Sequence, residues 1–160
     1  MNFKKSACID AMYCELPFLE RFRAAKEDGF DFVEFWNWED KDLGAMKAAA
    51  DRAGIRVSGF NGDAQYSLID PAQQALYLDF LECSVAVAKK LGAGCVTIHS
   101  NGLGKGGKVL RDYAELSNTV KLCSMYNTLT RCARLAEESG IQMNLEALNV
   151  TTDHAGNYLQ

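Results

Sequence analysis

The sequence lacks the features that mark secreted, membrane-spanning and nucleic-acid-binding proteins. Its six cysteines form no C-x-x-C pair and lie scattered in apolar segments, which is typical of buried thiols in a reducing compartment. No apolar run is long enough to cross a bilayer, and the opening MNFKKSACID has no signal-peptide core. Lys and Arg number 17 against 21 Asp and Glu, a net charge of −4, whereas phosphate binding needs a basic face. We therefore expect a cytoplasmic protein with no nucleic-acid and no membrane partner.

A helix–glycine–strand pattern recurs four times along the chain. The stretches are EDGFDFVEFW, DRAGIRVSGF, KKLGAGCVTIHS and EESGIQMNLEAL, and their glycines suit the left-handed residue that ends a helix. With an opening strand near SACIDAM, the pattern predicts five strands and four helices, the helices lying near 17–28, 42–53, 71–91 and 111–139. This alternation predicts parallel strands with right-handed crossovers in a single domain, residues 1–160.

Two α/β architectures fit this alternation: an open doubly wound sheet and part of a (β/α)8 TIM barrel. Strands in the open sheet are covered on both faces and read as unbroken apolar runs. Here they alternate: in IQMNLEALN, the side chains of Gln142, Asn144 and Glu146 share one face and aliphatic side chains take the other. FDFVEFW and CVTIHS alternate in the same way. An aliphatic face for helices and a polar face for an interior favour the barrel.

The length departs from a complete barrel, which typically needs about 250 residues. The 160 residues reach only a fifth strand, so we interpret the chain as a TIM barrel truncated after strand five. Its first and fifth strands would be open edges, which soluble proteins avoid exposing. The alternatives are a fragment of a longer protein and a homo-oligomer that closes by pairing with another copy.

Polar residues gather at the predicted carboxyl ends of the strands. The asparagines among them are Asn37, Asn61, Asn101 and Asn149. Asparagine favours turns for structural reasons, but four at equivalent places indicate a polar rim where barrel enzymes keep their chemistry. Glu146 stands there among Leu145, Ala147 and Leu148, and a carboxylate buried in such surroundings must be paired, hydrogen-bonded or bound to a metal.

Four segments resemble the hydroxypyruvate-isomerase-like sugar isomerases and epimerases, within the xylose-isomerase-like TIM-barrel superfamily: FVEFWNWEDKDL, SGFNGD, AVAKKLGAGCVTIHSN and LEALNVTTDHAGNYL. The resemblance implies an eight-stranded barrel with one divalent metal ion, Mn²⁺ or Mg²⁺. The family's ligands are a glutamate on strand five, an aspartate on strand six, a histidine or glutamine on strand seven and a glutamate on strand eight. Glu146 matches the first, as metal ligand and catalytic acid or base; the others lie outside these residues.

The resemblance also implies a reaction and a substrate site. The reaction is isomerisation or epimerisation of a small sugar or hydroxy-keto acid, by proton transfer through an enediolate. His99 would hydrogen-bond a substrate oxygen, Trp36 would form a wall for the sugar carbons, and Phe60 and Asn101 would complete the site. A satisfied structural histidine at 99 and a core position for Trp36 are the alternatives.

Other readings of the sequence remain open. An endonuclease-IV-like metal phosphodiesterase shares the barrel, but strand three ends in Gly59-Phe60-Asn61 with no histidine, and the net charge is negative. NGLGKGGKVL lacks the Walker spacing and is better interpreted as a loop before the fourth helix, although Lys105 and Lys108 suit an anionic substrate. The non-enzymatic alternative is an inactive or self-associating barrel fragment.

Overall fold

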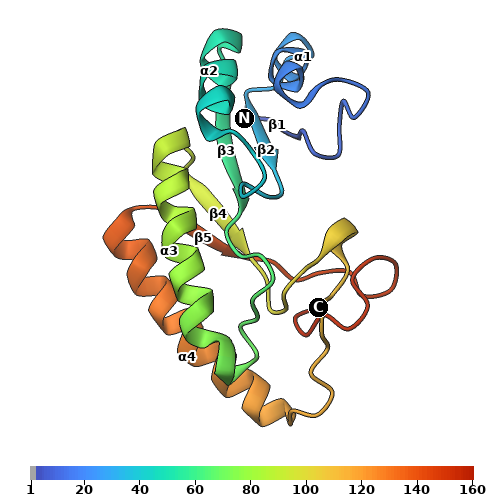
Figure 1. Ribbon diagram of the computed structural model, residues 1–160, viewed down its shortest axis with the longest axis vertical. Coiled ribbons are helices and arrows are strands. Elements are labelled where there is room, and N and C mark those ends of the chain that lie inside the picture. The colour runs from blue at the N-terminus through green and yellow to red at the C-terminus, as the bar shows by residue number, and fades with distance from the viewer. Residues whose placement is uncertain (1–2) are drawn as a thin grey trace.

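The computed structural model describes residues 3–160, which form one five-stranded parallel sheet in the order β1-β2-β3-β4-β5. The strands are β1 (Ser6–Cys8), β2 (Phe32–Phe35), β3 (Arg56–Asn61), β4 (Cys95–Ile98) and β5 (Gln142–Leu145). The helices are α1 (Arg21–Glu27), α2 (Leu43–Ala53), α3 (Gln74–Leu91) and α4 (Asn118–Ser139). Each helix follows one of the first four strands (Figure 1). The predicted fold, five parallel strands and four helices of a partial TIM barrel, is confirmed.

The helix boundaries follow local capping chemistry. Gly92 and Gly140 end α3 and α4 in left-handed conformations, with φ of 72° at both. The prediction that the fourth helix begins near 111 is wrong, because α4 begins at Asn118. Ser117 caps it by accepting a hydrogen bond from the Val120 amide, and Tyr113 has a positive φ of 54° that a helix does not allow. None of the helices in residues 3–160 has the length and apolar character needed to span a bilayer.

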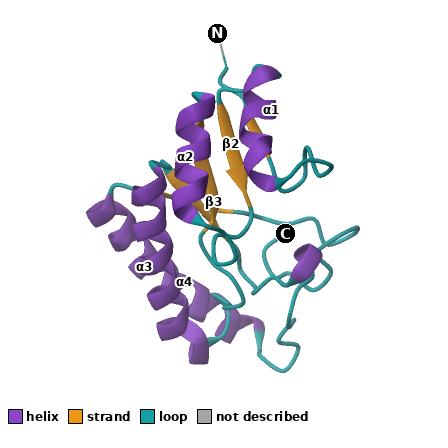
Figure 2. Ribbon diagram, turned by 45° about the horizontal axis from the view of Figure 1, so that its top comes forward, coloured by secondary structure: helices purple, strands orange, loops and turns teal. Residues whose placement is uncertain are grey.

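The two faces of the sheet differ as the alternating pattern predicts. The face toward the helices is buried and apolar, and its members include Val33, Phe35, Val57, Val96 and Ile98. The helices gather over this face (Figure 2). On the opposite face, Glu34 and Gln142 are exposed. This second face corresponds to a barrel interior, and no element within residues 3–160 covers it.

A register shift in the middle of the sheet changes the direction of the third strand's side chains. Val33 of β2 is paired with Val57, but the next residue, Glu34, is paired with Gly59, so Ser58 is extra. Gly59 is needed there, since a Cβ atom would lie 2.6 Å from Cys95 Sγ and 2.8 Å from the Cys95 carbonyl oxygen. Because side chains alternate with a period of two, one extra residue moves everything after it to the opposite face.

Candidate functional site

The candidate site consists of His99 and Glu146, which lie side by side at the carboxyl end of the sheet. His99 directly follows β4 and Glu146 directly follows β5. The Glu146 amide donates to the Ile98 carbonyl, 3.0 Å, continuing the pairing of the two strands. The two side chains then meet, with His99 Nε2 3.2 Å from Glu146 Oε2. Parallel strands thus bring together residues that are 47 positions apart in sequence.

Asp63, in the turn after β3, holds the other side of the His99 ring. His99 Nδ1–H donates to Asp63 Oδ1 at 2.9 Å, and the His99 backbone amide donates to Oδ2. The Tyr77 hydroxyl of α3 donates to the same Oδ2 at 3.2 Å. All three residues are buried, so the carboxylate has exchanged water for three protein donors. Asp63 was not among the predicted site residues; its only signal in the sequence is an acidic residue in SGFNGD, one of the segments that resemble the family.

The electrostatics of the site make His99 easier to protonate than an ordinary histidine. Burial of the ring opposes protonation, but hydrogen bonds and negative charge from Asp63 and Glu146 outweigh it and raise the pKa of His99 above its ordinary value. Burial also raises the pKa of Tyr77 well above its ordinary value, and the charge of Asp63 adds to this. Tyr77 therefore stays a hydroxyl donor to Asp63 throughout the physiological pH range.

Glu146 is more exposed than the sequence predicts. The expectation of a buried carboxylate is wrong, because 53% of its side chain is accessible, against 3% for His99. The reason is that Glu146 projects at the end of β5 on the open side of the sheet, where residues 3–160 provide no cover. Its carboxylate is therefore paired on one side with His99 and open to a ligand on the other.

Trp36 follows β2 at the same end of the sheet and is 48% exposed. Its backbone amide donates to Asp10 Oδ2 at 2.7 Å, and Asp10 forms an ion pair with Lys41 at 3.5 Å. These contacts fix the Trp36 backbone and leave its indole accessible. The role of Trp36 as a wall for a substrate therefore stays a prediction. Its exposure argues against the alternative of a core position.

Phe60 and Asn101 do not lie where a substrate could reach them. The register shift at Ser58 turns Phe60 to the helix side, where it is 3% exposed and stacks on Phe35 with ring centroids 5.1 Å apart. Asn101 is fully buried: its Oδ1 accepts from the Tyr158 amide at 2.8 Å, and its Nδ2 donates to the Arg111 carbonyl at 2.9 Å. Asn101 joins the loop after β4 to the loop after β5, and we exclude both residues from the site.

These residues could supply only part of the coordination site of a divalent metal ion. Glu146 offers a carboxylate, the type of hard oxygen ligand that Mn²⁺ and Mg²⁺ prefer, with the His99 imidazole beside it. Within residues 3–160, no three His, Cys, Asp or Glu side chains are grouped so that they could hold a metal ion. Further ligands from outside this set would be needed to complete the coordination.

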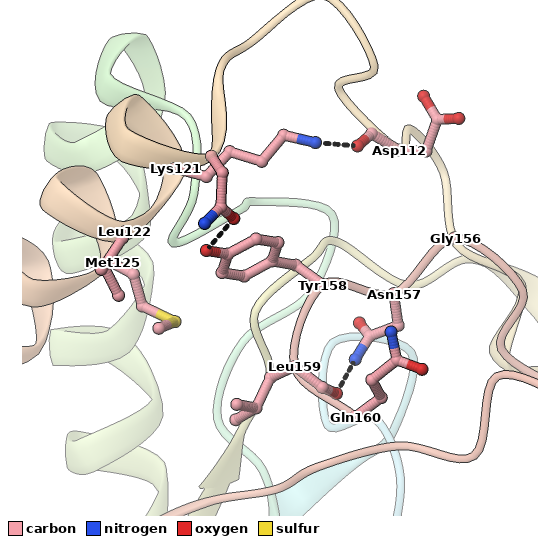
Figure 3. Close-up of a pocket in the computed structure, with 10 residues that line it drawn as sticks. Asp112, Lys121, Leu122, Met125, Gly156, Asn157, Tyr158, Leu159 and Gln160 are labelled. Atoms are coloured by element: carbon pink, nitrogen blue, oxygen red, sulfur yellow. Dashed lines mark hydrogen bonds between the residues drawn. The ribbon is translucent and has the colours of Figure 1, made fainter.

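Two surface hollows lie away from this pair. One, of about 510 Å³, is lined by the first turns of α4 and by residues 156–160 (Figure 3). Its rim carries the hydrogen bond from Lys121 Nζ to the Asp112 carbonyl, 3.0 Å, and that from the Tyr158 hydroxyl to Asn118 Oδ1, 2.7 Å. The other, of about 360 Å³, lies between Asp10, Lys41 and Met46. Neither includes His99 or Glu146. With 53% of the Glu146 side chain accessible, the candidate site lies on an open face of the sheet.

Comparison with known proteins gives one family match and several relatives. The family described as "Xylose isomerase-like TIM barrel" matches residues 22–160. A "2-oxo-tetronate isomerase" of Haemophilus influenzae is 32% identical over 104 residues, 60% of this chain and 39% of that protein. A Streptomyces coelicolor protein named "Putative hydroxypyruvate isomerase" is 27% identical over 157 residues, 88% of this chain and 53% of that protein.

Solved structures agree on the fold. One titled an AP endonuclease, family 2, from Brucella melitensis superposes with a TM-score of 0.80 at 21% identity, over 98% of this chain and 59% of that chain. The 3-keto-D-glucoside 4-epimerase YcjR from E. coli superposes with a TM-score of 0.68 at 20% identity, over 92% of this chain and 57% of that chain. The chain spans about half the length, or less, of the curated relatives it matches.

Proposed function

This chain belongs to the xylose isomerase-like TIM barrel family, and we propose that it carries the strand-five half of the active site of a divalent-metal-dependent isomerase or epimerase. The proposed substrate is a small sugar or hydroxy-keto acid, as in the names of its relatives. Six free thiols suit a reducing, cytoplasmic compartment. The observation that carries the proposal is the Glu146 carboxylate, accessible at the strand end and 3.2 Å from His99 Nε2.

Glu146 is the proposed acid or base. It accepts the proton from the carbon beside the substrate carbonyl; the C–H electron pair forms the double bond of an enediolate, and the negative charge develops on the carbonyl oxygen. Returning the proton to the former carbonyl carbon, while the hydroxyl proton passes from the neighbouring oxygen to the former carbonyl oxygen, gives the isomer. Returning it to the opposite face of the carbon that lost it gives the epimer. Donation from His99 Nε2 to a carboxylate or substrate oxygen orients the reacting groups.

Glu146 would also be the ligand that this chain contributes to the metal. When bound, a divalent cation supplies electrostatic stabilisation of the oxygen on which charge develops. The exposed side of the Glu146 carboxylate supports this role, because the other side is occupied by His99. A second carboxylate from outside residues 3–160 is required for the opposite half of the proton transfer.

Solvent hydrogen exchange tests the proposal without requiring complete turnover. Hydroxypyruvate and 2-oxo-tetronate are incubated in D₂O with Mg²⁺ and this chain, and in parallel with the full reading frame that contains it. Loss of the C–H proton signal beside the carbonyl is followed by NMR. We expect faster exchange with the wild-type protein than with Glu146→Gln, which keeps the shape but cannot accept the proton. Equal exchange rates for the two proteins in both formats would overturn the proposal.

Self-association is a second candidate role, and the sheet edges favour it. β1 and β5 each pair with one strand only within residues 3–160, so each presents unpaired backbone donors and acceptors. A dimer could satisfy these groups. Size-exclusion chromatography with light scattering, with and without Mn²⁺, separates the possibilities: a monomer at all concentrations rejects this role, and a dimer that binds Mn²⁺ supports a site completed between copies.

A further inference from the structure

Both carboxylate oxygens of Asp63 already accept hydrogen bonds from buried protein groups. Oδ1 faces His99 Nδ1 at 2.9 Å, and Oδ2 receives both the His99 amide and the Tyr77 hydroxyl. Asp63 is 6% exposed and Tyr77 is 1% exposed. A carboxylate that is buried and has both oxygens hydrogen-bonded to the protein acts on its neighbours rather than on a ligand.

The contact with Asp63 determines where the protons of His99 lie. A neutral imidazole has one N–H donor and one bare acceptor nitrogen, and an ionised carboxylate can only accept. Because Asp63 Oδ1 faces Nδ1, the stable arrangement has the proton on Nδ1 in the neutral ring and in the charged ring alike. The nitrogen that meets Glu146 is then always Nε2.

Asp63 also fixes the orientation of the ring by holding the same residue at two points. One oxygen holds the imidazole and the other holds the His99 backbone amide, so the rotation about both side-chain bonds is restricted. Tyr77 anchors Asp63 from α3 in turn. Among residues 3–160, the Glu146 side chain, 53% exposed, has no comparable anchor apart from His99.

We propose that Asp63 is a positioning residue for the site: by fixing the Nδ1–H form and the ring plane of His99, it directs Nε2 at the Glu146 carboxylate, the group that takes the substrate proton. The second part rests on the proposed function, whereas the first concerns this chain alone. Asp63 touches neither substrate nor the reacting atoms and acts through His99.

The state of the His99 ring can be read directly by NMR. The chain contains two histidines, His99 and His154, so a long-range ¹H–¹⁵N spectrum of the ring nitrogens contains two sets of signals. A His154→Gln variant assigns them. In the wild-type protein we expect His99 Nδ1 to carry a proton. A bare Nδ1 with the proton on Nε2 would overturn the proposal, and this measurement needs no variant of Asp63.

Two variants then test whether Asp63, rather than the residues around it, fixes the position of the His99 proton. In Asp63→Asn an amide NH₂ can face Nδ1 as a donor, and we expect the His99 proton to move to Nε2 while the His154 signals stay unchanged. Tyr77→Phe is the matched control, because it removes one donor to Asp63 and leaves both contacts to His99. It should keep the Nδ1 proton. A wild-type pattern in a folded Asp63→Asn, or the loss of the Nδ1 proton in Tyr77→Phe, would overturn the proposal.

Activity measurements address the second part of the proposal. In the full reading frame, Asp63→Asn should lower kcat by about 10- to 100-fold with little change in KM, as is typical when a group behind a functional histidine is replaced. A rise in KM at unchanged kcat would overturn it. If neither protein turns over substrate while the ring signals respond as expected, the proposed function fails and the role of Asp63 in fixing His99 stands.

Discussion

Replacing Gly59 by alanine tests whether the register shift of β3 is required for the fold. The new Cβ would lie 2.6 Å from Cys95 Sγ and 2.8 Å from the Cys95 carbonyl oxygen, both closer than carbon tolerates. The Sγ contact can relax by rotation, but the carbonyl belongs to β4, which is paired on both sides. Overpacking of this kind costs about 1–3 kcal/mol of unfolding free energy.

Urea denaturation measures this cost. With a denaturant slope of about 2 kcal/mol/M, we expect the midpoint of Gly59→Ala to fall by about 0.5–1.5 M. Gly94→Ala is the control, since a Cβ there meets nothing within 4 Å and its φ is not positive. It should change stability by no more than about 1 kcal/mol, in the stabilising direction if at all.

A double variant identifies which atom causes the strain. Adding Cys95→Ala to Gly59→Ala removes the sulfur and leaves the backbone oxygen at 2.8 Å, so only part of the lost stability should return. Full recovery would mean that the β4 backbone is not the obstacle. If Gly59→Ala matched Gly94→Ala in stability, the account of the register shift would be wrong, and with it the reason given for the direction of Phe60.

Three further outcomes follow from the site. The pKa of His99 is raised in the folded chain, so its contribution to stability is fully present below about pH 6.5 and is lost as pH rises through the folded pKa, with a slope of at most about 1.4 kcal/mol per pH unit. Urea midpoints that fall with rising pH, and flatten in His99→Gln, check this; a flat wild-type profile contradicts it. Asn101→Ala removes partners of the Tyr158 amide and the Arg111 carbonyl, so it should cost about 1–3 kcal/mol and speed proteolysis within residues 146–160; unchanged cleavage contradicts the loop-joining role. Trp36→Ala should change stability by less than about 0.5 kcal/mol and raise the KM for a sugar, whereas a large loss of stability would place the indole in the core after all.

The alternating patterns predicted the fold because they report which face of each strand is buried. Four helix ends at glycine and three alternating strands gave the order of elements and the helix-covered face. The start of α4 was missed because Arg111–Ser117 contains no proline or glycine to signal a loop, and the left-handed Tyr113 is a tertiary effect. Phe60 was misplaced for a similar reason, because an extra residue at Ser58 depends on close approach to β4.

The sequence predicts that Glu146 and His99 lie together at the carboxyl end of the sheet, but it does not predict Asp63, which lies behind His99. The resemblance and the strand period predict Glu146 and His99 at adjacent strand ends, and the two side chains lie there in contact, while their roles stay predictions. Asp63 is 36 positions from His99, in a turn where aspartate is common for local reasons, so its place in SGFNGD does not by itself indicate a role at the site. Only the folded chain shows that both of its oxygens are used on another element.

The contacts of Asp63 connect the helix-packed core to the open face of the sheet. Tyr77 lies on α3 among buried apolar side chains, Asp63 lies at the end of β3, and His99 and Glu146 lie at the ends of β4 and β5. A displacement of α3 would therefore reach the Glu146 carboxylate through three hydrogen-bonded contacts, although no atom of α3 belongs to the site. For this reason a substitution in the α3 core, such as Leu81→Ala, should broaden or shift the His99 ring signals as well as lower stability. Met46→Ala in α2 should also lower stability but leave the His99 ring signals unchanged.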